Sequence, residues 1–354
     1  MLIQTTKTMR TPHIISIKTT VIITIALTIF SCSSSIKVTS LGEGFDEVYT
    51  ERQSAEEILR IPKDSVTYAV IVDDLLCLFD NHRNREHTPT IRISEISSPE
   101  DYKGFIEYGI EAEQVAMPFF NQSGGKISIY DPLLGKVSVL NVQEAYQEEG
   151  YEPVFKNTAI ISQRVCPFGD RVVFINSFAF EGNEPLVMIS DENWSTKQRD
   201  NLGTYLNVMS GVLFTDHEQT RIGYARREIP ELVIFDNKAK PLFKLTFPHT
   251  PWRFQKFEQN DGSFEYLREI NQNFKECVYT GCGGEDLFSL VYDDEKGNDQ
   301  VVLIFNWEGD IVDGFRTDGT IQKVSLSKDE KSLYIWERIG EDDVLNRYSL
   351  KNTR

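Results

Sequence analysis

Arginine residues close to aromatic residues are the side chains of this sequence best suited to binding a ligand. A guanidinium group forms two parallel hydrogen bonds with a carboxylate or a phosphate, and it stacks on aromatic rings. This pairing points to an anionic ligand that carries a carboxylate, a phosphate or a sugar-acid group. The candidate ligand-binding residues are Arg83, Arg85, Tyr224, Arg226, Arg227, Trp252, Arg253, Trp336 and Arg338.

No catalytic motif accompanies these arginines. The Gly-x-Ser-x-Gly sequence of serine hydrolases does not occur, and His217-Glu218 lacks the second histidine of a zinc protease. His82 and His87 share a loop with basic residues, which disfavours a bound metal cation. The acidic segment 293–299 breaks the spacing of a calcium-binding loop. We therefore expect no catalytic residue, no metal and no cofactor.

Aspartates recur between the predicted strands and could be taken for metal ligands. Their side chains also stabilise tight turns by accepting hydrogen bonds from backbone amides, and every one of them falls in a predicted hairpin turn. We interpret them as turn residues. The set consists of Asp73, Asp74, Asp170, Asp216 and Asp329.

The elements that must position these residues are short strands. Apolar alternations bounded by Gly, Asp, Asn and Pro fill the chain after residue 35, which is typical of an all-β fold. One hairpin pattern occurs six times, at 67–81, 117–131, 159–178, 207–225, 274–293 and 324–336. The strands that follow these hairpins are spaced roughly 43–49 residues apart, apart from one gap of roughly 69, which matches the period of propeller blades.

This period predicts a six-bladed β-propeller over 35–354, built from four-stranded antiparallel blades with an insertion at about 248–269. A seven-bladed ring or a long sandwich is the alternative. The last blade lacks its fourth strand, and we expect 35–42 to supply it and so cover an open sheet edge.

Propeller topology places the loops after the second and fourth strands of each blade on one face, where ligands enter the channel. The candidate residues fall on loops that we assign to this face, and the insertion with Trp252 and Arg253 would cover it. An open alternative is that the aromatic residues belong to the core between blades while the arginines only solubilise the loops.

The first 31 residues have the features of a secretory signal peptide. Basic residues precede an apolar segment from Val21 to Phe30, which is far shorter than the roughly 20 residues of a spanning helix. The ending "IFSC" resembles the lipobox of bacterial lipoproteins. That resemblance implies cleavage before Cys32, lipidation of Cys32 as the membrane anchor, and a tether at 32–34. An ordinary cleaved signal with an incidental cysteine is the alternative.

Four further cysteines follow Cys32. Cys277 and Cys282 are five residues apart, so an exported chain could join them in a local disulfide. Cys77 and Cys166 lie in apolar strand patterns and are predicted to be small buried residues.

The net charge of −17 becomes −20 once the three basic residues of the leader are removed, which argues against nucleic acid as a partner. The leader together with hairpins such as "VIVDDLLCLFD" and "VSLSKDEKSLYIW" resembles the TolB-like six-bladed propeller lipoproteins of Bacteroidetes. This resemblance implies a lipoprotein of the bacterial cell envelope, in the outer membrane. It implies a binding or scaffold module for an unknown small molecule, glycan or envelope protein, and it transfers no catalytic residue. A propeller lyase or hydrolase acting on an anionic glycan or lactone, and an assembly partner in the envelope, are the other hypotheses.

Overall fold

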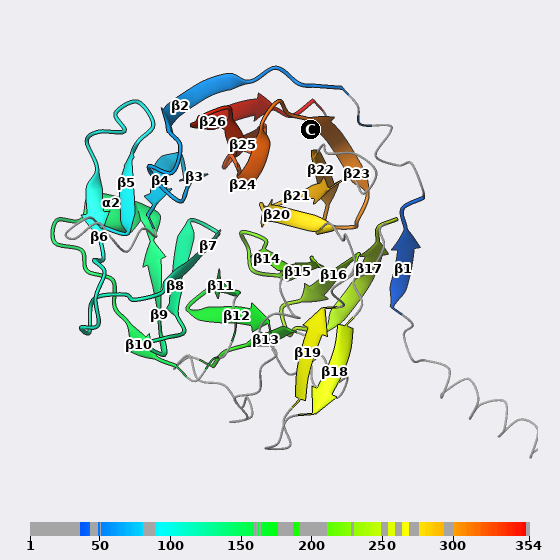
Figure 1. Ribbon diagram of the computed structural model, residues 1–354, viewed down its shortest axis with the longest axis horizontal. Coiled ribbons are helices and arrows are strands. Elements are labelled where there is room, and N and C mark those ends of the chain that lie inside the picture. The colour runs from blue at the N-terminus through cyan, green and yellow to red at the C-terminus, as the bar shows by residue number, and fades with distance from the viewer. Residues whose placement is uncertain are drawn as a thin grey trace, which may run out of the picture. The chain divides into compact units, whose positions relative to one another are not determined.

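The computed structural model describes residues 36–42, 49, 51–80, 89–158, 160, 162, 164–175, 187–191, 211–227, 230–248, 254–258, 264–268, 276–293 and 300–351. The propeller lies in the compact unit Val38–Arg354. Within this unit, small antiparallel sheets surround a central channel as six blades (Figure 1). The six-bladed propeller predicted from the sequence is therefore confirmed.

The first three blades follow one another along the chain. The first contains β3 (Tyr68–Val72), β4 (Leu75–Phe79), β5 (Ile91–Glu95) and β6 (Lys103–Phe105). The second contains β7 (Phe119–Ser123), β8 (Lys126–Asp131), β9 (Lys136–Asn141) and β10 (Lys156–Asn157), with the short helix α2 (Val142–Gln147) after β9. The third contains β11 (Val165–Phe168), β12 (Arg171–Ile175) and β13 (Val187–Ile189).

The remaining blades complete the ring. The fourth contains β14 (Gly211–Thr215), β15 (Arg221–Arg226), β16 (Glu231–Asp236) and β17 (Pro241–Thr246). The fifth contains β20 (Val278–Gly283), β21 (Leu287–Asp293), β22 (Gln300–Asn306) and β23 (Ile311–Arg316). The sixth contains β24 (Thr320–Leu326), β25 (Ser332–Ile339), β26 (Asp342–Ser349) and, outermost, β2 (Glu56–Pro62).

Turn residues explain why the inner hairpins form where the sequence predicts them. Asp73 and Asp74 have φ angles of 48° and 64°, and Gly124 and Gly125 have φ angles of 54° and 72°. Two successive positive φ angles twist a two-residue hairpin in the sense that the flanking strands require. The predicted turn role of the aspartates is confirmed at Asp216, whose Oδ1 accepts hydrogen bonds from the backbone amides of Thr220 in the turn at 2.8 Å and Arg221 at the start of β15 at 3.0 Å.

A strand from the N-terminal part of the chain completes the sixth blade, as predicted, but it is not the predicted segment. Segment 35–42 was expected to complete the sixth blade, but β1 (Lys37–Ser40) lies beside β17 on the outer edge of the fourth blade. The sixth blade is completed by β2, which pairs antiparallel with β26 (Figure 1). The physical reason is apolar contact, since β2 packs Leu59 and Ile61 against the core between the sixth and first blades, whereas β1 is a largely exposed strand of four residues.

Arg52 and Gln53, which precede β2, lie along the outer edge of the fifth blade. Arg52 forms a parallel bridge with Arg316 of β23, and the backbone amide of Gln53 donates to the Arg316 carbonyl at 3.3 Å. The N-terminal segment thus covers the outer edges of the fourth, fifth and sixth blades in turn. Covering these edges removes unpaired backbone groups that could otherwise pair with another chain.

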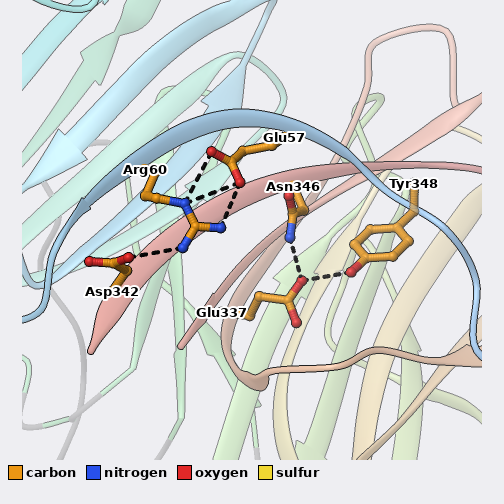
Figure 2. Close-up of polar contacts among 6 residues, drawn as sticks. All are labelled: Glu57, Arg60, Glu337, Asp342, Asn346 and Tyr348. Carbon is orange, nitrogen blue, oxygen red and sulfur yellow. Dashed lines mark hydrogen bonds and ion pairs between the residues drawn. The ribbon is translucent and has the colours of Figure 1, made fainter. Parts of the chain in front are cut away.

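Polar contacts stabilise the sixth blade both at its outer edge and in its interior (Figure 2). On the outside, Arg60 of β2 pairs with Glu57 at 2.7 Å and with Asp342 of β26 at 2.9 Å. Inside the blade, the fully buried Glu337 carboxylate accepts hydrogen bonds from Asn346 at 2.8 Å and Tyr348 at 2.6 Å. A buried carboxylate needs such partners because an unpaired one would be strongly destabilising.

The predicted insertion contains a hairpin of its own. Strands β18 (Phe254–Glu258) and β19 (Phe264–Arg268) pair with each other in a separate two-stranded sheet. The insertion was expected to cover the channel mouth, but its described hairpin lies outside the ring of blades and not over the channel (Figure 1). Trp252 and Arg253 lie outside the described residues.

Candidate functional site

A cavity of about 190 Å³ lies at one end of the central channel. The innermost strand of each of the six blades, or the residue just before it, contributes to its wall, as expected from the position of β3, β7, β11, β14, β20 and β24 around the centre (Figure 1). One water needs roughly 10–15 Å³ of such space, so the cavity has room for on the order of ten water-sized groups. It therefore suits a small metabolite.

Three cationic side chains line this cavity and come from three different blades. Arg164 precedes β11, Arg227 follows β15, and Lys323 lies in β24. Among the described residues that line the cavity, none carries a carboxylate. In a chain with a net charge of −17, this arrangement makes the cavity a local positive site that attracts anions.

Lys323 owes its position to a β-bulge. Ile321 pairs with Glu337 and Lys323 pairs with Trp336, so Gln322 is an extra residue in β24. A bulge bends its strand and redirects the neighbouring side chains. A second β-bulge, in β20, makes Tyr279 an extra residue of that strand. Gln322 and Tyr279 both line the cavity.

The Lys323 ammonium is held in an unfavourable electrostatic environment. Its contact in the described part of the chain is the face of the Tyr68 ring, 5.4 Å from the ring centroid. Burial, followed by the positive charges of Arg164 and Arg227, lowers the pKa of Lys323 to about 8. A bound anion would offset both effects, because it supplies the opposite charge that the cavity wall lacks.

Arg227 is anchored by contacts that hold its side chain at the wall. One terminal nitrogen donates to the Tyr279 carbonyl at 3.1 Å, the other lies 3.5 Å from the Glu276 carboxylate, and the guanidinium lies 5.5 Å from the Tyr279 ring centroid. Its Nε atom is buried without a hydrogen-bond partner. A buried donor in this state is costly, and a ligand oxygen would satisfy it.

Arg164 is positioned by a hydrogen bond to the neighbouring fourth blade. Its Nε donates to the carbonyl of Gly211 at 2.7 Å. A Cβ atom at Gly211 would lie 2.5 Å from the Ala225 carbonyl and from the Tyr224 ring. Glycine at 211 therefore permits the close packing of β14 on β15 within the fourth blade, which presents this carbonyl.

Side-chain amides form the floor of the cavity. Asn121 of the second blade donates to the Leu213 carbonyl of the fourth blade at 2.9 Å, and Gln122 donates to the Val324 carbonyl of the sixth blade at 3.3 Å. These bonds cross the channel. Beyond them is a second cavity of only about 30 Å³, enclosed by hairpins that include Asp73 and Gly125. The larger cavity is therefore blind and opens on the face predicted from the topology.

The structure separates the predicted ligand residues into distinct groups. Arg227 lines the cavity, whereas Arg226 lies 3.9 Å from Glu231 with a side chain only 14% exposed. Tyr224 and Trp336 are fully buried in the cores between blades, so the alternative interpretation holds for these aromatic residues. Cys32, Arg83, Arg85, Trp252 and Arg253 lie outside the described residues.

Arg338 belongs to the ring closure and not to the cavity wall. It contacts the buried Asp343 carboxylate of β26 at 2.9 Å and Asp64, just after β2, at 2.9 Å. The cavity residues Arg164 and Lys323 were not singled out from the sequence. The sequence does contain a hint for Lys323. Two consecutive polar residues, Gln322 and Lys323, break the apolar alternation of the strand, and such a break is typical of a β-bulge.

The four cysteines that the structure describes are buried and form no disulfide, so the local disulfide between Cys277 and Cys282 is not formed. Cys277 belongs to the core between the fourth and fifth blades, and Cys282 belongs to the core between the fifth and sixth. The two side chains thus lie in separate cores, which explains the absence of the bridge. Burial raises the pKa of Cys282 to about 12, which keeps the thiol protonated.

Two absences hold for the part of the chain that the structure describes. In that part, no group of three or more His, Cys, Asp or Glu side chains could hold a metal ion. No helix there has the length and apolar character to span a bilayer.

Comparisons with known proteins identify the fold alone. No family model matches the sequence, and no curated protein matches it. The structure resembles a crystal structure from Bacteroides fragilis NCTC 9343, provisionally described as an exported protein, with a TM-score of 0.51 and 7% identity over 90% of this chain and 100% of that one. It also resembles a member of the DUF4221 family from Bacteroides vulgatus ATCC 8482, with a TM-score of 0.51 and 11% identity over 85% of this chain and 99% of that one. The TolB-like family itself is not identified by these comparisons.

Proposed function

We propose that this protein is a non-catalytic binding module of the bacterial cell envelope and that its ligand is a small anion held in the channel cavity. The observation that carries the proposal is the convergence of Arg164, Arg227 and Lys323 on one blind cavity without a carboxylate among its described lining residues. A site of this kind binds a negative group strongly because the surrounding protein excludes water and weakens screening.

The envelope location rests on the leader and its cysteine. A signal peptide ending at Ser31 and a lipidated Cys32 would export the chain and anchor it, in our proposal at the outer membrane. A structural neighbour provisionally described as an exported protein supports the same location.

A propeller lyase or hydrolase is the main alternative. Such an enzyme needs an acid, a base or a metal within reach of the bond that it cleaves. Among the described residues of the cavity wall, no side chain is an imidazole or a carboxylate, and the groups that could transfer a proton are Lys323 and the phenols of Tyr68 and Tyr279. Lys323 shares the wall with Arg164 and Arg227, and the three cations together can hold an anion, which favours binding over cleavage.

An assembly partner is the third hypothesis, and the separate β18–β19 hairpin gives it a structural basis, because it extends from the ring without joining a blade (Figure 1). Pull-down from solubilised membranes with and without 248–264 distinguishes it from ligand binding. Loss of a specific partner on deletion supports the assembly hypothesis.

Isothermal titration calorimetry tests anion binding. The purified protein is titrated with glucuronate, glucose 6-phosphate, succinate and neutral glucose, and we expect heat from at least one anion and none from glucose. Arg227→Gln should weaken binding, whereas Lys328→Gln should not, because Lys328 lies at the opposite end of the channel. Absence of binding to every anion, or equal binding of glucose, contradicts the proposal.

A further inference from the structure

We infer that the ligand carries a phosphate monoester on a body no larger than a monosaccharide. This inference rests on the proposed function and names the ligand class of the same cavity. It follows from the number, the type and the placement of the cationic groups, from the size of the cavity and from the polar and aromatic side chains between the cations.

The placement of the cations fits a tetrahedral anion better than a planar one. A carboxylate presents two oxygens in one plane and is satisfied by a single arginine fork. A phosphate monoester presents three oxygens that point in different directions. Arg164, Arg227 and Lys323 come from the third, fourth and sixth blades and therefore approach the cavity from three sides.

The residue types support the same ligand. Lysine binds phosphate as a compact point charge, while the planar arginine fork is suited to either anion. Arg227 already lies 3.5 Å from the Glu276 carboxylate, and it still has a buried Nε without a partner. Lys323 has no carboxylate contact in the described chain and lies over the Tyr68 ring. A dianion supplies charge to both groups at once.

The remaining wall residues suit the body of a phosphorylated sugar. Gln322 and Asn121 provide amide groups at the wall and the floor, and Phe119, Phe120 and Tyr279 provide aromatic surface. Amides bind sugar hydroxyls and aromatic rings pack against the apolar face of a sugar. The volume of about 190 Å³ is below the range of roughly 300–1,000 Å³ that drug-sized ligands occupy.

The charge states predict a pH window for binding. A phosphate monoester gains its second charge above about pH 6. Lys323 loses its proton as the pH rises through about 8, so its contribution is present below that value. Affinity should therefore be highest between about pH 6 and 8 and fall on both sides. The charged and titratable groups that face Lys323 include no carboxylate and are Arg164, Arg227, Cys166, Cys282 and Tyr68.

Calorimetry with glucose 6-phosphate and glucuronate at pH 5, 7 and 9 tests this inference. We expect glucose 6-phosphate to bind more tightly at pH 7, and to lose affinity at both pH 5 and pH 9. Glucuronate, whose carboxyl group has a pKa of roughly 3.5, should lose affinity only at pH 9. Lys323→Gln should weaken binding of glucose 6-phosphate by roughly 10- to 100-fold and abolish the decrease at pH 9.

Lys328→Gln is the matched control and should leave the affinity unchanged, because this exposed lysine lies beyond the amide floor. If the Lys323 variant does not fold, the pH dependence of glucose 6-phosphate affinity in the unmodified protein tests the inference instead. A parallel titration with vesicles that contain phosphatidate shows whether the phosphate belongs to a lipid, since a lipid headgroup can present the same phosphate monoester. Binding of glucose 6-phosphate with the predicted pH profile supports the inference, whereas binding of the vesicles alone shows that the phosphate belongs to a lipid headgroup and overturns the stated size of the ligand.

The failures of the two proposals are distinguishable. Glucuronate binding as tightly as glucose 6-phosphate, or a glucose 6-phosphate affinity that is unchanged from pH 5 to 7, overturns the phosphate inference while the anion site stands. No binding by any anion overturns both.

Discussion

Replacement of Arg338 by glutamine tests whether this residue serves ring closure or ligand binding. Its guanidinium donates to the Asp343 carboxylate from Nε at 2.9 Å and from a terminal nitrogen at 3.2 Å. Asp343 is fully buried and also accepts a hydrogen bond from the backbone amide of Asp64 at 3.0 Å. The substitution leaves this buried carboxylate without its cationic partner, on the blade that closes the ring.

The magnitude follows from these contacts. Hydrogen bonds to a charged group contribute about 1.5–3 kcal/mol each, and removing one partner of a buried ion pair costs about 3–5 kcal/mol. The Arg338 side chain is 30% exposed, so water can partly replace it. We therefore expect Arg338→Gln to lower the free energy of unfolding by about 2–3 kcal/mol, and the melting temperature by about 4–8 °C.

Urea unfolding and thermal melting measure the change, and calorimetry measures anion affinity in the same variant. The matched control is Arg60→Gln, which removes an arginine whose side chain is 41% exposed from the outer edge of the same blade and should leave the melting temperature nearly unchanged. If Arg338→Gln left stability unchanged and removed ligand binding, the assignment of Arg338 to ring closure would be wrong.

Two further predictions concern the hairpin face of the channel. Burial raises the pKa of Glu330 from 4.5 to about 7, so its stabilising contribution is complete below pH 4.5 and is lost as the pH rises through 7. In urea unfolding, the free energy of unfolding of Glu330→Gln should therefore increase relative to that of the unmodified protein between pH 5 and pH 8. A difference between the two proteins that stays constant over this range contradicts the prediction. Gly125→Ala should destabilise the protein by about 2–4 kcal/mol, more than Gly150→Ala does. Both glycines have a φ of +72°, but only the Cβ at 125 would lie 2.3 Å from the Asp73 carboxylate, so equal melting temperatures of the two variants would show that this clash is relieved.

Much of the fold could be predicted because its signals are local. Apolar alternation marks each inner hairpin, and residues that tolerate positive φ, such as Asp73 and Gly124, mark the turns between them. The choice of closing strand is not local. Segment 35–42 and β2 both alternate as strands do, and only the contact of Leu59 and Ile61 with the core between blades distinguishes them.

The candidate site could be predicted only in part. Topology placed Arg227 on the correct face, but the same argument included Tyr224 and Trp336, which are buried between blades. Successive residues of a strand point to opposite sides, and a β-bulge shifts this alternation by one residue. The position of an aromatic residue in the sequence therefore does not say whether its side chain faces the core or the channel. Lys323 reaches the cavity through such a bulge.

The sequence by itself determined the repeat, the strand pairs and the turns, because each depends on residues within one blade. Only the tertiary structure decided that an acidic chain contains a cationic cavity, and that this cavity is blind. Its walls come from six blades and its floor from amide bonds across the channel. Residues so far apart in the chain come into contact only when the ring closes, so no local sequence pattern can predict that contact.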